Sequence, residues 1–466
     1  MTTGFADLWY WRGTISRGRY AAVGISALVV KFLVDWSVAL GVFHRAWMPW
    51  SYWLFPMRSQ MAAMAPRAVG DSDAVFAVTM LAIAIPFIWL GVTLTVQRLR
   101  DAGQPLWLVV LFFVPIINTL FFLLLCVVEA HPRAEVAQAA PWPETRALDS
   151  WIPRSKLGAG LVAILVTAAV GLVFTLLSTQ ALKTYGAGLF VALPFCLGLF
   201  SVLVYSYHEP RSYFSCLTVS LVPVAVVGAL LLVVAIEGLI CILMAAPFAT
   251  ALSALGGALG YAIQVGYWRA RQAPAMLSIV LLFAPGFSGV ERVAHLQPQT
   301  FVVKSAIEVN AAPEKVWKEV VSFGEIAPPK EMIFRAGIAY PIRAEMIGSG
   351  AGAVRHCVFS TGQFVEPIYV WDAPRLLKFG VSENPPPMRE ITPYASIEPA
   401  HLHGYFVSHQ GQFLLTALPG GRTRLEGTTW YSHTIWPEAY WHLWSDYIVH
   451  RIHMRVLEHI KSEVER

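Results

Sequence analysis

Few side chains in this 466-residue sequence have the type and spacing that catalysis needs, and His356 is the first of them. It lies in the alternating stretch AVRHCVFST, where a polar residue on an apolar strand face could pair with Glu366 or Glu426 as general acid and base. The adjacent Cys357 points to the opposite face of a strand, so the two cannot form a Cys–His dyad. A histidine hydrogen-bonded within the fold is the structural alternative.

The C-terminal third contains eight other histidines, but none has the acidic companion of an HExxH-like zinc motif. A Gly-rich phosphate loop, a serine nucleophile elbow and a dinucleotide fingerprint are also missing from the sequence. The sequence therefore predicts no metal site and no cofactor, and it leaves open whether the protein is an enzyme.

Charged side chains inside apolar runs are a second group of candidates. Glu237 lies near the middle of a run that we expect to form one membrane helix over residues 223–246, and Cys241 shares its face one turn later. A carboxylate at this depth costs about 2.5–3.5 kcal/mol, so Glu237 is either a proton or ligand contact or a protonated packing residue. Lys31 and Asp35, also four residues apart, are expected to neutralise each other.

A third group is basic and flanks the first two apolar runs. Positive residues next to membrane segments set orientation, and they can also pair with lipid phosphates. We expect these side chains to meet at one membrane face, either as a lipid contact or as an anchor containing a buried Arg–Asp pair. The group consists of Arg12, Arg17, Arg19, Arg98, Arg100 and Asp101.

Composition indicates what positions these residues. Hydrophobic residues make up 56% of the chain and charged residues 14%, which is too apolar for an ordinary soluble protein. Runs of about 20 apolar residues, long enough to cross a bilayer, occur in residues 1–299. Most of the net charge of +5 belongs there as well, because residues 300–466 hold 16 basic and 17 acidic residues. This distribution argues against a nucleic-acid partner, which would require a basic face on a soluble domain.

The chain is expected to comprise four parts: an N-terminal membrane domain (1–130), a linker (131–156), a second membrane helix bundle (157–292) and a C-terminal domain (300–466). The number of crossings has two solutions. Either residues 106–128 are re-entrant, or they cross fully and residues 275–290 cross too. Both solutions place the C-terminal domain in the cytoplasm. The cysteines show no spacing typical of a disulfide framework, which fits a reducing compartment.

The C-terminal part reads as strand, helix, short helix, about six strands and a long helix over 437–465. Its opening, TFVVKSAIEVNAAPEKVWKEVVSF at 300–323, places Pro313 and Glu314 at a helix start and Trp317 one turn later. This part resembles the SRPBCC (START-like, polyketide cyclase-like) superfamily. The resemblance implies an α+β helix-grip fold, an antiparallel sheet around the last helix.

The N-terminal part carries a second resemblance. WRGTISRGRY at 11–20 and RLRDAGQPLW at 98–107 are similar to the paired motifs of a small bacterial inner-membrane family of unknown function. Thr14 and Arg100 depart from the Arg and His that the family usually has. The resemblance implies a multi-pass protein of the bacterial inner membrane and no known activity.

A sheet wrapped around a helix can leave an apolar cavity, so we expect a hydrophobic or lipid-like ligand. Membrane lipids are the other expected partner, and the oligomeric state is left open. The proline-rich segment 384–404 is either a lid or a surface loop. The alternatives are a cyclase or dehydratase using His356 with a glutamate, and a membrane-anchored scaffold. The aromatic residues expected to line the cavity are Phe359, Phe364, Trp371, Phe406, Phe413, Trp430, Trp441 and Trp444.

Overall fold

The structure is a computed structural model, and the chain divides into two compact units. One unit comprises Met1–Ala229 and Ala246–His295, and the other comprises Leu230–Ala245 and Leu296–Arg466. Within these units, the structure describes residues 8–9, 13–45, 47–49, 51–52, 71–114, 117–130, 148, 150–267, 273–294, 298–394, 397 and 399–466. Most of the expected linker at 131–156 therefore lies outside the described residues.

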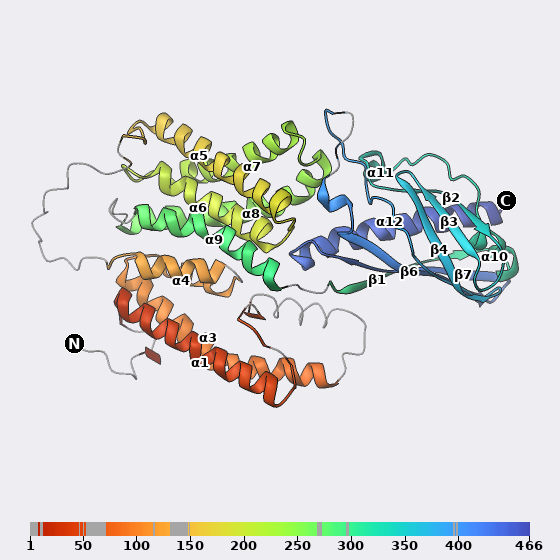
Figure 1. Ribbon diagram of the computed structural model, residues 1–466, viewed down its shortest axis with the longest axis horizontal. Helices are drawn as coiled ribbons and strands as arrows, with labels where there is room; N and C mark the ends of the chain where they lie inside the picture. Colours follow the sequence, from red (N-terminus) through yellow and green to blue (C-terminus); the bar gives the residue numbers. More distant parts are fainter. Residues whose placement is uncertain are drawn as a thin grey trace, which may run out of the picture. The chain divides into compact units, whose positions relative to one another are not determined.

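The first unit is helical, and two of its helices continue into residues 230–245 of the second unit (Figure 1). Six helices within the described part of the chain are long and apolar enough to cross a membrane. This confirms the predicted polytopic bundle. The elements are α1 (Arg17–Gly41), α3 (Asp71–Asp101), η2 (Leu106–Phe113), α4 (Ile117–Val127), α5 (Lys156–Leu176), η3 (Leu177–Ala181), η4 (Gly188–Ala192), α6 (Leu193–Tyr205), α7 (Tyr213–Val233), α8 (Leu239–Tyr267) and α9 (Ala273–Ala294).

The expectation of one helix over 223–246 is wrong. Helix α7 begins ten residues earlier with Pro223 inside it, and α8 runs through Pro247. Proline is tolerated within membrane helices because neighbouring groups satisfy the freed backbone carbonyl. The chain instead breaks at residues 234–238, where Ala235 adopts a positive φ of 57°. Glu237 is therefore in a turn between two helices, not in mid-span.

The segment 106–128 consists of two short helices, η2 and α4, instead of one long one. Arg98, near the end of α3, is fully buried and donates to the carbonyl oxygens of Leu125 and Val128 at the end of α4. A cation at a helix C-terminus is favourable because the last carbonyls lack partners and carry negative partial charge. Both ends of the segment thus meet at the end of α3, which fits the re-entrant solution.

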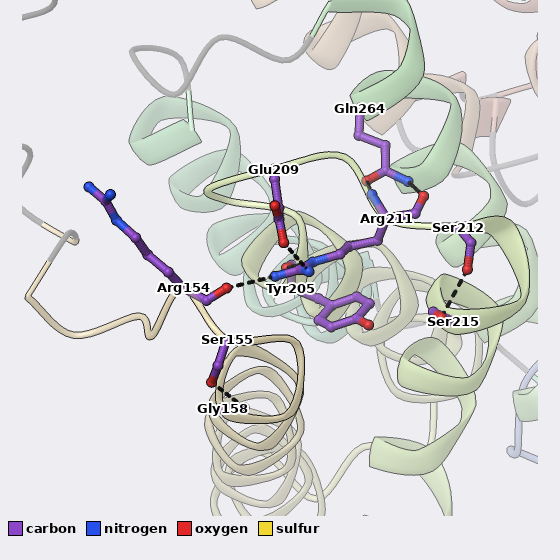
Figure 2. A network of polar contacts seen from close by, with 9 residues as sticks. All are labelled: Arg154, Ser155, Gly158, Tyr205, Glu209, Arg211, Ser212, Ser215 and Gln264. Carbon is purple, nitrogen blue, oxygen red and sulfur yellow. Dashed lines mark hydrogen bonds and ion pairs between the residues drawn. The ribbon is translucent and has the colours of Figure 1, made fainter.

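A polar network joins three helix ends in the same unit (Figure 2). The side-chain amide of Gln264, near the end of α8, accepts from the Arg211 amide and donates to the Arg211 carbonyl, both at 2.8 Å. The Arg211 guanidinium donates to the Arg154 carbonyl at 3.2 Å and forms an ion pair with Glu209. The residues before α5, those before α7 and the end of α8 therefore lie together.

The second unit contains one seven-stranded antiparallel sheet in the order β1-β7-β6-β5-β4-β3-β2. The long helix α12 (Glu438–Val464) runs beside the strands (Figure 1). The strands are β1 (Thr300–Val309), β2 (Pro341–Ile347), β3 (Val354–Phe359), β4 (Gly362–Asp372), β5 (Leu376–Gly380), β6 (Phe406–Leu418) and β7 (Arg422–His433). The remaining helices are α10 (Pro313–Val321), α11 (Met332–Arg335) and η5 (Ala400–Leu402).

The core of this unit lies between one face of the sheet and α12. Val456, Leu457 and Ile460 on α12 pack with Val316 and Val320 on α10, and strand residues such as Leu377 and Leu425 complete the cluster. Alternation within each strand places every second side chain in this core. The order of elements confirms the predicted helix-grip fold.

Candidate functional site

The acid–base pair expected at His356 does not form. Arg355, the preceding residue, lies directly opposite Glu366 on the neighbouring strand, and the two form a buried ion pair at 2.6 Å. Residues directly opposite in a sheet share a face, whereas adjacent residues do not. His356 lies opposite Val365 and Glu345, so it points to the other face of the sheet. Burial raises the pKa of the Glu366 carboxyl, and the Arg355 guanidinium acts in the opposite direction.

Glu426 cannot replace Glu366 as the partner of His356. Strands β7 and β3 are separated by β6, β5 and β4, which places them about 19 Å apart at ~4.8 Å per strand. The prediction that Trp430 lines the cavity is also wrong. Its neighbour Tyr431 donates to Asp446 on α12, so Trp430 faces away from α12, where it lies against Lys378.

The other expected ligand contacts lie on the α12 side of the sheet or on α12 itself. Phe413 belongs to the buried core, and Phe359, Phe364 and Trp371 pack against it partly buried. Phe406 stacks on Tyr431 with 5.0 Å between ring centres. Trp441 is buried and Trp444 half-buried on α12. Their role in ligand binding stays a prediction.

Histidines on α12 are held by hydroxyl groups of the sheet. His450 and His453 each contact Ser305 Oγ through Nδ1, at 2.8 and 3.1 Å, and His453 Nε2 contacts Thr429 Oγ1 at 2.7 Å. Burial, with a smaller effect of His450, lowers the pKa of His453 to about 4. His453 is therefore neutral at physiological pH, as a hydrogen-bonded structural residue would be.

A different group of reactive side chains does converge. Four residues place one donor atom each within 4.8 Å of one another: Glu237, Cys241, Glu390 and His401. We call this group the Cys–His cluster. Cys241 Sγ lies 2.7 Å from Glu390 Oε1 and 3.1 Å from His401 Nε2. On the other side of the ring, His401 Nδ1 lies 3.3 Å from Glu237 Oε2.

Backbone pairing positions this cluster. The Leu239 amide, at the start of α8, donates to the Ile391 carbonyl at 2.9 Å and so fixes Glu390 beside the α7–α8 turn. The Arg389 amide bonds the Gly337 carbonyl at 2.8 Å on the other side. His401 sits on η5, whose Leu402 is buried in an apolar cluster with Met388.

Electrostatics within the cluster favour a protonated imidazole. Burial lowers the pKa of His401, but its hydrogen bonds with Cys241, Glu237 and Glu390 raise it more, to about 12. Because the folded pKa lies above the ordinary value, this contribution to stability is fully present below about pH 6.5. It is lost only as the pH rises through about 12.

Sequence reasoning missed the cluster as a unit. The sequence marks Glu237 and Cys241 as unusual, and His401 is one of the eight other histidines of its C-terminal third. However, Cys241 and His401 are 160 positions apart, so no spacing rule connects them. Glu390, next to Arg389 in a proline-rich stretch, looks like a surface residue in the sequence.

The N-terminal candidates lie in the other unit. Lys31 and Asp35 form the expected ion pair, and the Tyr52 hydroxyl also donates to Asp35 at 2.7 Å. Arg98 pairs with Asp101, and Arg17 lies 3.8 Å from Glu129. Arg19 and Arg100 lie on α1 and α3, and Arg12 is outside the described residues.

The fold and these sites define a multi-pass helical protein with a helix-grip domain. Residues 8–135 match the family model described as protein of unknown function DUF805. The match includes both basic motifs and confirms the N-terminal resemblance, but it assigns no activity. A search of curated proteins finds no match.

Solved structures similar to the C-terminal part include an aromatase/cyclase from Streptomyces sp. R1128. It is 16% identical with a TM-score of 0.26, and the alignment covers 36% of this chain and 95% of that one. Norcoclaurine synthase from Thalictrum flavum is 13% identical with a TM-score of 0.24, covering 36% and 96%. Scores this low carry no functional argument, and the helix-grip assignment rests on strand order and the packing of α12.

Proposed function

We propose that the C-terminal domain binds a hydrophobic, lipid-like molecule that it exchanges with the membrane beside the start of α8. One observation carries the proposal. Ile240 and Cys241, which follow the turn between two candidate spans, pack against a buried apolar cluster of the helix-grip domain. That cluster consists of Phe334, Ile338, Met388 and Leu402, with Ile448 and Ile452 of α12 packed against it.

The physical reason is continuity of apolar surface. A lipid tail that leaves the bilayer loses about 0.8 kcal/mol for every methylene exposed to water. Contact between the first turn of a membrane helix and the domain interior shortens the exposed path. Tyr394 and Tyr440 donate to the carbonyls of Val233 and Met244, which holds the α7–α8 turn within the same unit.

Photo-crosslinking of the full chain in nanodiscs containing a diazirine-labelled phospholipid tests the proposal. We expect labelled peptides from segments 332–348, 384–404 and α12 as well as from the candidate spans. Phe364→Ala should lower labelling of the domain about tenfold, since burying an aromatic ring is worth roughly 1.5–3 kcal/mol.

Trp430→Ala, on the outer face of the sheet, is the matched control and should leave the labelling unchanged. Label confined to the candidate spans would favour the scaffold alternative. The cyclase alternative required His356 to face the cavity beside Glu366 or Glu426. Because His356 lies on the opposite face of the sheet from Glu366, this alternative has no specific observation in its favour.

We also propose that the protein resides in a bacterial cytoplasmic membrane, with the domain on its outer side. The sequence predicts a cytoplasmic domain in both of its solutions, with residues 106–128 re-entrant or with residues 106–128 and 275–290 both crossing. Support for an extracytoplasmic domain comes from α7 and α8, whose ends remote from the turn at residues 234–238 meet in the network of Arg211 and Gln264. Their junction belongs to the C-terminal unit, so that unit is reached after one more crossing.

The distribution of basic residues indicates which end of the bundle faces the cytoplasm. Arg154, Lys156 and Arg211 flank the network end of the bundle, and basic residues concentrate on the cytoplasmic side of bacterial membrane proteins. Helix α9 is not one of the six candidate spans, since its apolar part in the described residues is Leu277–Gly289. Its 22 residues together span about 33 Å at 1.5 Å per residue, which is close to the thickness of the hydrocarbon core, and the proposal requires that it crosses.

Reporter fusions check this orientation. Alkaline phosphatase fused after Arg466 should be active, because this enzyme matures only outside the cytoplasm. Green fluorescent protein fused at the same position should not fluoresce. Fusions made after Arg154 should show the reverse. A fluorescent, phosphatase-negative fusion at Arg466 would restore the cytoplasmic assignment.

A further inference from the structure

The Cys–His cluster shares Cys241 with the apolar contact of the proposed function, but its four polar donor atoms are not needed to bind a lipid-like molecule. Among the described residues it is the group of side chains that could hold a metal ion. We infer that it is a metal site for a divalent transition ion of the zinc class. Cys241, Glu390 and His401 are the ligands, and Glu237 orients the imidazole. The inference is independent of the proposed function, since either can hold without the other.

The donor geometry supports three ligands. Cys241 Sγ, Glu390 Oε1 and His401 Nε2 form a triangle with sides of 2.7, 3.1 and 3.3 Å. An ion about 2.0–2.3 Å from each atom, the usual range for Zn²⁺ with N, O and S ligands, fits above such a triangle. Three protein ligands are also the usual number in zinc sites that keep one position for water or substrate.

Glu237 completes the arrangement from behind the ring. Its Oε2 lies 3.3 Å from His401 Nδ1, on the far side from the other two ligands. A carboxylate in this position fixes the tautomer that leaves Nε2 free to bind a metal and raises the basicity of the ring. Glu237 therefore orients the imidazole through Nδ1, whereas Glu390 is a ligand beside Nε2.

Burial makes a bound cation favourable. The Glu390 side chain is fully buried, and its Oε2 accepts no hydrogen bond from any described residue. No described Lys or Arg forms an ion pair with it. A buried carboxylate needs a compensating charge, which either protonated His401 or a divalent ion bound with the Cys241 thiolate can supply.

A glycine, Gly238, leaves room for the Glu390 carboxylate beside Cys241. A Cβ at Gly238, the residue between Glu237 and α8, would overlap Glu390 Oε2. Glycine is therefore required for the carboxylate to reach Cys241 in this position. Gly238→Ala perturbs the site without removing any donor atom, which makes it a useful probe.

The donor set selects the class of ion. Thiolate and imidazole are soft or borderline ligands that favour Zn²⁺ over Mg²⁺ and Ca²⁺, which prefer oxygen alone. The rival interpretation is that protonated His401 is the only cation and the cluster binds no metal.

Titration of the purified, chelator-treated full chain with Co²⁺ and Zn²⁺ distinguishes a metal site from a metal-free cluster with a protonated His401. We expect about one ion per chain and, with Co²⁺, a near-ultraviolet thiolate charge-transfer band. Cys241→Ser should abolish the band, and Glu237→Gln should weaken Zn²⁺ binding by about 10–100-fold, as loss of an orienting carboxylate does. Cys126→Ser, which removes the other half-buried cysteine, should keep both the band and the affinity.

Two further variants test the inference if Cys241→Ser does not fold. Glu390→Gln keeps the shape of the side chain and Gly238→Ala keeps every donor, and both should lower the affinity for Zn²⁺ at least tenfold. A wild-type chain with no thiolate band, or with equal Zn²⁺ stoichiometry in the wild type and Cys241→Ser, would overturn the inference in favour of the protonated histidine.

Discussion

Arg355→Ala is expected to lower the free energy of unfolding of the C-terminal unit by about 3–5 kcal/mol, because it leaves the Glu366 carboxylate buried without its partner. The guanidinium is 2% exposed and sits 5.4–5.5 Å from the ring centres of three phenylalanines. No described Lys or Arg other than Arg355 forms an ion pair with Glu366. At about 2–4 °C per kcal/mol, the melting temperature should fall by roughly 6–20 °C.

Thermal unfolding of the full chain in detergent measures this effect. The double variant Arg355→Met, Glu366→Leu removes both charges and should recover most of the loss, since an apolar replacement of a buried ion pair is often neutral or stabilising. Arg422→Ala, which breaks the exposed pair with Glu308, is the control and should cost less than about 1 kcal/mol. Equal losses for the single and double variants would contradict the role assigned to the unpaired charge.

Gly256→Leu is expected to prevent α6 and α8 from packing together. A Cβ at Gly256 would overlap the backbone carbonyl oxygen of Phe195, and a Cβ at Gly198 would overlap that of Ser253. Close approach of two membrane helices through small residues maximises van der Waals contact where no hydrophobic driving force exists. Overpacking costs about 1–3 kcal/mol when side chains can adjust, and more is expected where the obstacle is backbone.

The measurement is the fraction of monodisperse protein that survives heating, followed by size-exclusion chromatography. Gly286→Leu is the matched control, because a Cβ at that position of α9 has no heavy atom within 4 Å. It should be neutral or slightly stabilising, since leucine favours a helix over glycine by up to about 1 kcal/mol. If both variants survive heating equally, the close approach of α6 and α8 does not limit stability.

Local patterns in the sequence were sufficient for the architecture. Runs of about 20 apolar residues predicted the spans, and period-two alternation predicted the strands of the sheet. Lys31 and Asp35 could be paired in advance because four residues on a helix fix their distance. These features depend only on neighbours along the chain.

The errors share one cause. Pro223 and Pro247 were interpreted by their intrinsic preference for helix ends, whereas packing in the bundle keeps both inside helices. His356 was paired with Glu366 without knowledge of strand register, and register assigned Glu366 to Arg355 instead. A shift of one residue reverses the face of every side chain, so the polar pairing depended on tertiary information.

The sequence by itself thus determined that this is a membrane-spanning helical protein ending in a helix-grip domain, because hydropathy and periodicity are local properties. Only the tertiary structure decided which polar side chains meet. Cys241 and His401 are 160 positions apart, and they come together because Leu239 pairs with Ile391 and because Leu402 is buried beside Met388. Contacts over such distances are selected by packing and backbone pairing, which no spacing in the sequence encodes.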